Sequence, residues 1–195
     1  DYGSNHGFEL LFMQGFLFDF QTALVEWAVL LGRAAIFADC GMGNTPMQLV
    51  WAENVLRKTN KPVLILTPLA VSGQTLEEAE KFGIEAHRAD VCAGPTTIQV
   101  TNYEKLHHFD ADSYGGVVCD ESSILKNFDG QRKAAITEFM RRIPYRLLCT
   151  ATAVPNDWTE IGTSSEALGY LGYMDMLTRF FTRRQTFALR DRING

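Results

Sequence analysis

The stretch Ala38-Asp39-Cys40-Gly41-Met42-Gly43-Asn44-Thr45 decides the fold, because it lies between an apolar run and a helical pattern. The apolar run at 34–38 is typical of a strand, and residues 46–58 are typical of a helix. A glycine loop between a strand and a helix lets backbone N–H groups approach a phosphate at the positive helix end. The stretch therefore predicts a phosphate-binding loop, the alternative being a tight strand-to-helix turn that binds nothing.

The last two residues of this loop determine its chemistry. Thr45 stands where a hydroxyl holds a Mg²⁺ that bridges phosphates. The position before it should carry a lysine that acts as a point charge on the phosphates, and here it is Asn44. Because Asn44 is shorter and neutral, we expect nucleotide binding in weakened form and no fast hydrolysis. The candidate nucleotide-binding residues of the loop are Gly41, Met42, Gly43, Asn44 and Thr45.

Apolar runs alternate with helical patterns on both sides of the loop. Further strands are predicted at 63–67, 85–89, 97–101, 116–119 and 145–149, and further helices at 19–31, 74–82 and 130–142. This alternation indicates βαβ units, and hence a three-layer α/β domain with a mainly parallel central sheet. We expect a lead-in segment at 1–15, one domain at 16–171 and a basic tail at 172–195.

Polar motifs follow several of the predicted strands. They are Thr67-Pro68, Thr101-Asn102, Asp120-Glu121 and Thr150-Ala151-Thr152. Because the carboxyl ends of parallel strands share one edge of a sheet, we expect these motifs and the glycine loop to form one site.

The acidic pair supplies the predicted catalytic groups. Beside a phosphate loop, Asp120 is expected to hold Mg²⁺ opposite Thr45, and Glu121 to orient and deprotonate the attacking water. The alternative is that Asp120 caps the next segment, as aspartate often does. Upstream, Gln21 near the start of the helix 19–31 is placed to read an adenine edge, since its amide both donates and accepts; the alternative is a solvated side chain.

Taken in this order, the motifs resemble those of the first RecA-like lobe of a superfamily-two helicase, nearest the Swi/Snf-type translocases and their phage-encoded relatives. The second motif, Asp120-Glu121-Ser122-Ser123-Ile124-Leu125-Lys126-Asn127, resembles the D-E-A-H-x-x-K-N form, with Ser122 and Ser123 in place of alanine and histidine. The match runs from about residue 16 to residue 171.

The resemblance implies a P-loop NTPase fold, ATP and Mg²⁺ as cofactors, and DNA as the tracked partner. It implies that Gln21 recognises adenine, that Asp120 and Glu121 act in hydrolysis, and that a second lobe supplies arginine fingers. We expect that second lobe to be missing from this chain. The residues that it assigns to the nucleic-acid backbone are Pro68, Leu69, Thr101 and Asn102, and those that it assigns to coupling are Thr150, Ala151 and Thr152.

Composition limits the other possibilities. The formal net charge of −5 argues against a generally basic nucleic-acid coat, although it allows a local basic surface. The four cysteines show no C-x-x-C spacing, so packing thiols in a reducing compartment are expected and zinc is not. No apolar run approaches a membrane span, and we expect the cytoplasm of a bacterium or of a phage-infected host.

Two functions from different classes remain open at this point. The first is the nucleotide-binding lobe of a DNA-dependent ATPase, deficient in hydrolysis as it stands. The second is a stand-alone module that binds nucleotide, nucleic acid or protein without hydrolysis, which Asn44 and the acidic balance favour. A small-molecule P-loop kinase is a weaker third, because such kinases keep the lysine and lack Thr150-Ala151-Thr152 in this place.

Overall fold

Strands and helices alternate along the chain, as the sequence predicts. The computed structural model describes residues 6–37, 43–90, 96–121, 128–150 and 167–169, and all structural statements below concern these residues. The strands are β1 (Arg33–Phe37), β2 (Val63–Thr67), β3 (Ala86–Arg88), β4 (Ile98–Asn102), β5 (Gly116–Cys119) and β6 (Tyr145–Thr150). The helices are α1 (Asp19–Leu31), α2 (Asn44–Thr59), α3 (Ser72–Lys81) and α4 (Gly130–Arg142), with the short 3₁₀ helices η1 (Tyr103–His108) and η2 (Ala111–Ser113).

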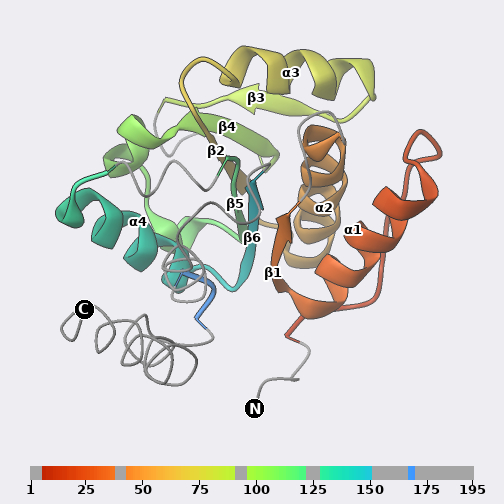
Figure 1. Cartoon of the computed structure of the whole chain (residues 1–195), viewed down its shortest axis with the longest axis horizontal. Coiled ribbons are helices and arrows are strands. Elements are labelled where there is room, and N and C mark those ends of the chain that lie inside the picture. The colour runs from red at the N-terminus through yellow and green to blue at the C-terminus, as the bar shows by residue number, and fades with distance from the viewer. Residues whose placement is uncertain (1–5, 38–42, 91–95, 122–127, 151–166, 170–195) are drawn as a thin grey trace, which may run out of the picture.

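All six strands form one sheet in the order β1-β6-β5-β2-β4-β3 (Figure 1). Every neighbouring pair is parallel, so the predicted sheet is confirmed. The register pairs Phe37 with Thr150 and Thr67 with Asn102, which brings the ends of β1, β6, β2 and β4 to a common edge. The motifs that follow these strands therefore start from the same side of the sheet.

Each central strand is buried on both faces, because its side chains alternate between two layers of helices. In β2, Val63 and Ile65 join one apolar cluster, whereas Leu64 and Leu66 join the other. In Figure 1 the helices α1 and α2 lie on one side of the sheet and α4 on the other. The predicted three-layer architecture is thus confirmed.

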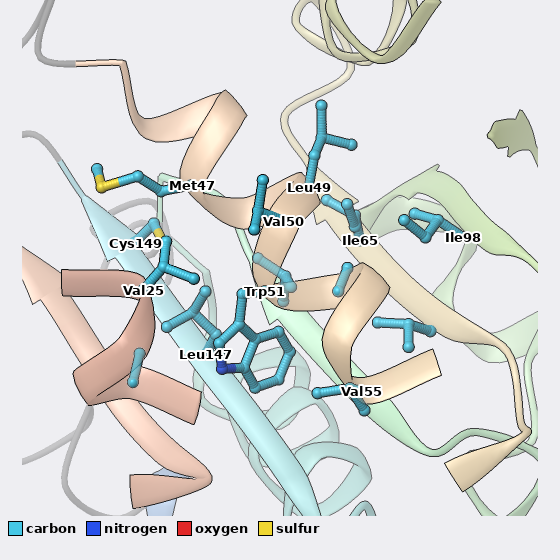
Figure 2. Close-up of a cluster of buried hydrophobic side chains, with 14 of the residues drawn as sticks. Val25, Met47, Leu49, Val50, Trp51, Val55, Ile65, Ile98, Leu147 and Cys149 are labelled. Carbon is cyan, nitrogen blue, oxygen red and sulfur yellow. The ribbon is translucent and has the colours of Figure 1, made fainter. Parts of the chain in front are cut away.

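The larger cluster lies between the sheet and the helices α1, α2 and α3, and Trp51 of α2 is its largest fully buried side chain. In Figure 2 the indole of Trp51 lies beside Leu147 of β6, with Val55 one turn further along α2. This packing fixes the position of α2, and therefore of the loop that precedes it, against the sheet.

The second cluster lies under α4 and the two 3₁₀ helices. Ile136, Phe139 and Met140 of α4 pack with Tyr103 and Tyr114 against the face of β5 and β2 that bears Leu64 and Leu66. The side chains of Asn102 and Asp110 cap η1 and η2 by accepting hydrogen bonds from Lys105 N and Asp112 N. These 3₁₀ turns were not predicted, because segments of three to six residues are too short to show a helical period.

Part of the lead-in segment belongs to the same packed unit. The N–H groups of His6, Gly7 and Phe8 donate to carbonyls in the last turn of α1. The side chain of Asn54 accepts from the N–H groups of Leu11 and Phe12, at 2.8 and 2.9 Å. A buried amide of α2 therefore holds a segment that has no regular structure of its own.

α2 begins at Asn44, two positions before its predicted start. Pro46 is tolerated there because it falls in the first turn, where its missing N–H would have no helical partner.

None of the described helices combines the length and the apolar character that a membrane crossing requires.

Candidate active site

The glycine loop enters α2 through Gly43, whose backbone conformation favours glycine. Its φ of +75° is left-handed, and an added Cβ would lie 2.5 Å from the amide nitrogen of Gln21. Gly41 and Met42 lie outside the described residues. Gln21, the predicted adenine-reading residue, thus lies next to the one loop glycine that the structure describes.

The amide of Gln21 joins the start of α1 to the start of α2. Its Oε1 accepts from Phe18 N at 3.0 Å, and its Nε2 donates to the carbonyl of Gly43 at 3.5 Å. The side chain is buried, so the solvated alternative is wrong. Contact of Gln21 with adenine remains a prediction. It requires the base to approach the Gln21 amide where it bonds to Phe18 N and to the Gly43 carbonyl.

The first turn of α2 is where an anion site is predicted. Asn44 and Thr45 are its first two residues, both half-buried, and the turn contains no acidic side chain. Unpaired N–H groups and the helix dipole both favour a phosphate at such a position.

Asp120 follows β5, and three neighbouring groups fix it. Gln48 of α2 donates from Nε2 to Asp120 Oδ1 at 2.6 Å, and Tyr103 donates its hydroxyl to the Asp120 carbonyl at 2.7 Å. The Asp120 N–H donates to Leu66 O. Burial raises the pKa of the Asp120 carboxyl, the Gln48 bond lowers it in part, and the charge of Glu121 raises it further. The Gln48 bond joins this side chain to α2, while residues 122–127 of the segment that it was alternatively predicted to cap lie outside the described residues.

Glu121 adopts a left-handed backbone conformation, with a φ of +50°. This conformation is uncommon for a residue with a side chain, and it often marks functional sites. The hydroxyl of Thr150, at the end of β6, donates to Glu121 Oε1 at 3.1 Å. The predicted catalytic and coupling motifs are thus in direct contact through Thr150, while Ala151 and Thr152 lie outside the described residues.

The ends of β2 and β4 present the predicted nucleic-acid residues unequally. Leu69 is 65% exposed and Pro68 is half-buried, so both lie at or near the surface. Thr101 and Asn102 are buried, and the Asn102 side chain is engaged as the cap of η1. A backbone contact by these four residues remains a prediction, which Pro68 and Leu69 support better than Thr101 and Asn102.

The oxygen donors at this edge suit Mg²⁺. A hydroxyl from Thr45 and a carboxylate from Asp120 are ligands that a hard cation prefers. Within the described ranges, no group of three or more His, Cys, Asp or Glu side chains is close enough to hold a metal. Such a sparse donor set fits Mg²⁺, which is usually bound by one or two protein oxygens together with water and substrate phosphates.

Sequence reasoning did not identify Gln48 or Tyr103. Gln48 lies three residues after Thr45, which places both side chains on one face of α2 and was a readable signal. Tyr103 follows Thr101-Asn102 directly, but no pattern in the sequence shows that its hydroxyl reaches the backbone of Asp120, 17 positions away.

Replacing Asp120 with asparagine is expected to stabilise the fold at neutral pH. Burial raises the folded-state pKa of the Asp120 carboxyl above that of an exposed aspartate, so the ionised form destabilises the folded state as the pH rises above the unfolded-state pKa. Asp120→Asn should raise the free energy of unfolding at pH 7 by about 0.5–2 kcal/mol, and the gain should shrink toward pH 4. Urea unfolding at both pH values measures this.

Asp129→Asn is the matched control for this prediction. Asp129 caps α4 by accepting from Arg132 N, and asparagine caps a helix equally well. This control should leave stability nearly unchanged, and a loss of stability in Asp120→Asn would contradict the expectation.

Solved structures with the same fold are helicase and ATPase cores. The SWI2/SNF2 ATPase core of Sulfolobus solfataricus in complex with dsDNA superposes with a TM-score of 0.71 at 20% identity, over 92% of this chain and 42% of that chain. The UvsW helicase of bacteriophage T4 gives 0.65 at 10% identity, over 85% of this chain and 61% of that one. The Hef helicase domain of Pyrococcus furiosus gives 0.60 at 16% identity, over 77% and 36%.

These similarities concern the fold, because each identity is low. This chain spans less than two thirds of the length of each of these three structures. No protein-family model and no curated protein matches the sequence. The parallel sheet and the three superpositions agree, and the chain has the three-layer α/β fold that is found in these helicase and ATPase cores.

Proposed function

We propose that this chain is the ATP-binding lobe of a DNA-dependent ATPase of the helicase or translocase type, deficient in hydrolysis as it stands. The observation that carries the proposal is the cluster around Asp120 and Glu121. Hydrogen bonds link these carboxylates to α2 through Gln48 and to β6 through Thr150, next to the helix start expected to bind phosphate. A buried carboxylate with a raised pKa at such an edge is typical of a functional site.

Each residue has a distinct role in this proposal. The first turn of α2 and Gly43 receive the phosphates, Thr45 and Asp120 hold Mg²⁺, and Gln21 faces the adenine. When bound, Mg²⁺ neutralises charge on the phosphates. Glu121 orients the attacking water and accepts its proton. Asn44 supplies no charge to the phosphates, and this limits the lobe to binding.

The proposed partner is the backbone of DNA. The archaeal SWI2/SNF2 ATPase core that shares this fold was solved with dsDNA. Here Leu69 and Pro68, after β2, offer the exposed surface, and contacts of this kind are independent of sequence and sensitive to salt. A second lobe would complete the nucleotide cleft.

A stand-alone module that binds without hydrolysis is the second candidate. Asn44 favours it, because that residue removes the fixed charge on which hydrolysis depends. Glu121 favours the first candidate, because its side chain is still held in place by Thr150.

Calorimetric titration of this chain with ATP and with ADP, each with Mg²⁺, tests the proposal. Micromolar dissociation constants are the expected result, because the helix start and the Gly43 turn remain intact without lysine. Absence of binding at millimolar nucleotide would reject the nucleotide-binding role and leave a module that contacts nucleic acid or protein.

A further inference from the structure

The buried amide of Gln48 is a polar group that no predicted role explains. It lies on α2, one turn after Thr45, and its side chain is fully buried. Its Nε2 donates to Asp120 Oδ1 at 2.6 Å, across 72 positions of sequence. Among the described residues, its Oε1 has no hydrogen-bond partner.

This arrangement fixes the orientation of the amide. A carboxylate accepts and does not donate, so only the NH₂ group of Gln48 can face Asp120. The carbonyl oxygen then remains buried and unpaired, which destabilises the fold. A leucine or methionine at this position would avoid that unpaired oxygen, so the amide carries a cost to stability of the kind that is common at functional sites.

Two donors hold the carboxylate of Asp120. Oδ1 accepts from Gln48 Nε2, and the backbone N–H of Glu121 also hydrogen-bonds to the carboxylate. The backbone of Asp120 is held separately, because its N–H donates to Leu66 O and its carbonyl accepts from Tyr103. With the main chain fixed, these two bonds to the carboxylate set how the side chain is turned, and the one from Gln48 joins it to α2.

We propose that Gln48 is a positioning residue that orients the Asp120 carboxylate for the Mg²⁺ that Asp120 and Thr45 would hold. The inference rests on the proposed function, since it assigns a residue to the same metal site. α2 carries both Thr45 and Gln48, so one helix sets the hydroxyl and the carboxylate relative to each other. Outer partners of metal ligands commonly act in this way.

The test is the factor by which Mg²⁺ strengthens nucleotide binding. For each protein, the dissociation constant of ATP is measured by calorimetry with excess EDTA and with saturating Mg²⁺, and the ratio gives the Mg²⁺ enhancement. The variants are Gln48→Met, which removes the amide at nearly constant length, and Gln99→Met as control. Gln99 is another buried glutamine and lies in β4. Its Oε1 accepts from the Tyr114 hydroxyl at 2.7 Å, and it has no assigned role at the site.

Gln48→Met should reduce the Mg²⁺ enhancement by about tenfold or more, while its affinity for metal-free ATP changes by less than about twofold. Gln99→Met should leave the enhancement unchanged. In an Asp120→Asn background, Gln48→Met should have no further effect, because its action passes through that carboxylate. All proteins are compared both with Asn44 and with Asn44→Lys, so that weak binding does not hide the ratio.

Other outcomes would overturn the inference. An unchanged enhancement in Gln48→Met would reject it while leaving the proposed function intact. Equal losses of affinity with and without Mg²⁺ would show that Gln48 only supports the fold. If Gln48→Met does not fold, Gln48→Asn, whose amide is too short to reach Asp120, replaces it, and failure of both to fold would also reject the inference. Absence of ATP binding in every protein, including Asn44→Lys, would reject the proposed function together with it.

Discussion

Asn44→Lys is expected to strengthen ATP binding by about 10- to 100-fold. A lysine at this position places an ammonium group against the phosphates, and a hydrogen bond to a charged group contributes about 1.5–3 kcal/mol. Asn44 is the first residue of α2, where the N-terminal end of the helix already favours an anion. The added charge therefore acts in the same direction as the helix dipole, and calorimetric titration with Mg²⁺ present measures the gain.

The gain should depend on the number of phosphates and on charge. Lysine in this loop acts on the outer phosphates, so the affinity for AMP should change much less than the affinity for ATP. Asn44→Met lengthens the side chain without adding charge, and it should not strengthen binding. Equal gains for AMP and ATP, or a gain in Asn44→Met, would show that the effect does not come from a phosphate-bound ammonium group.

Trp51→Ala is expected to lower the free energy of unfolding by about 3–5 kcal/mol. Trp51 is fully buried in the cluster between α2 and the sheet, where its indole lies beside Leu147 (Figure 2). Truncation leaves a cavity that the packed strands cannot close. Urea unfolding followed by circular dichroism measures the loss.

Two further variants separate cavity formation from other causes. Trp51→Phe should cost much less, because it keeps the ring packing and removes an N–H that has no acceptor among the described residues. Trp27→Ala is the matched control, since Trp27 is 46% exposed on α1 and its loss should stay within about 1 kcal/mol. A loss from Trp27→Ala as large as that from Trp51→Ala would contradict the position of the core.

The central strands were predictable because a strand that is buried on both faces is apolar at nearly every position. β2 and β5 have the predicted bounds, since each is a continuous apolar run between residues that end it. α1 was equally clear, because its apolar positions recur at helical spacing and Gly32 follows it with a φ of +70°. The 3₁₀ turns after β4 depend on single side-chain caps, which leave no period to read.

The candidate site was predictable in its membership and not in its contacts. Parallel strands bring their carboxyl ends together whatever their side chains, so Asp120, Glu121 and Thr150 could be assigned to one edge. The bond from Thr150 to Glu121 spans 29 positions and depends on backbone angles that sequence does not encode locally. Gln48 was missed for the same reason, since its partner belongs to a different element.

The place of β6 in the sheet has a consequence for the order in which the chain folds during synthesis. Among the described strands, β1 pairs with β6 alone, and β6 itself lies between β1 and β5. The ribosome makes β1 before the other described strands, and it makes the neighbour of β1 in the sheet, β6, after them. Until β6 is made, α1 and the lead-in segment can pack against α2. β1 cannot yet be joined through the sheet to β5, the strand that Asp120 follows. Nascent chains released before Thr150 would therefore lack a joined site, and binding activity should arise in a single step once β6 has been made.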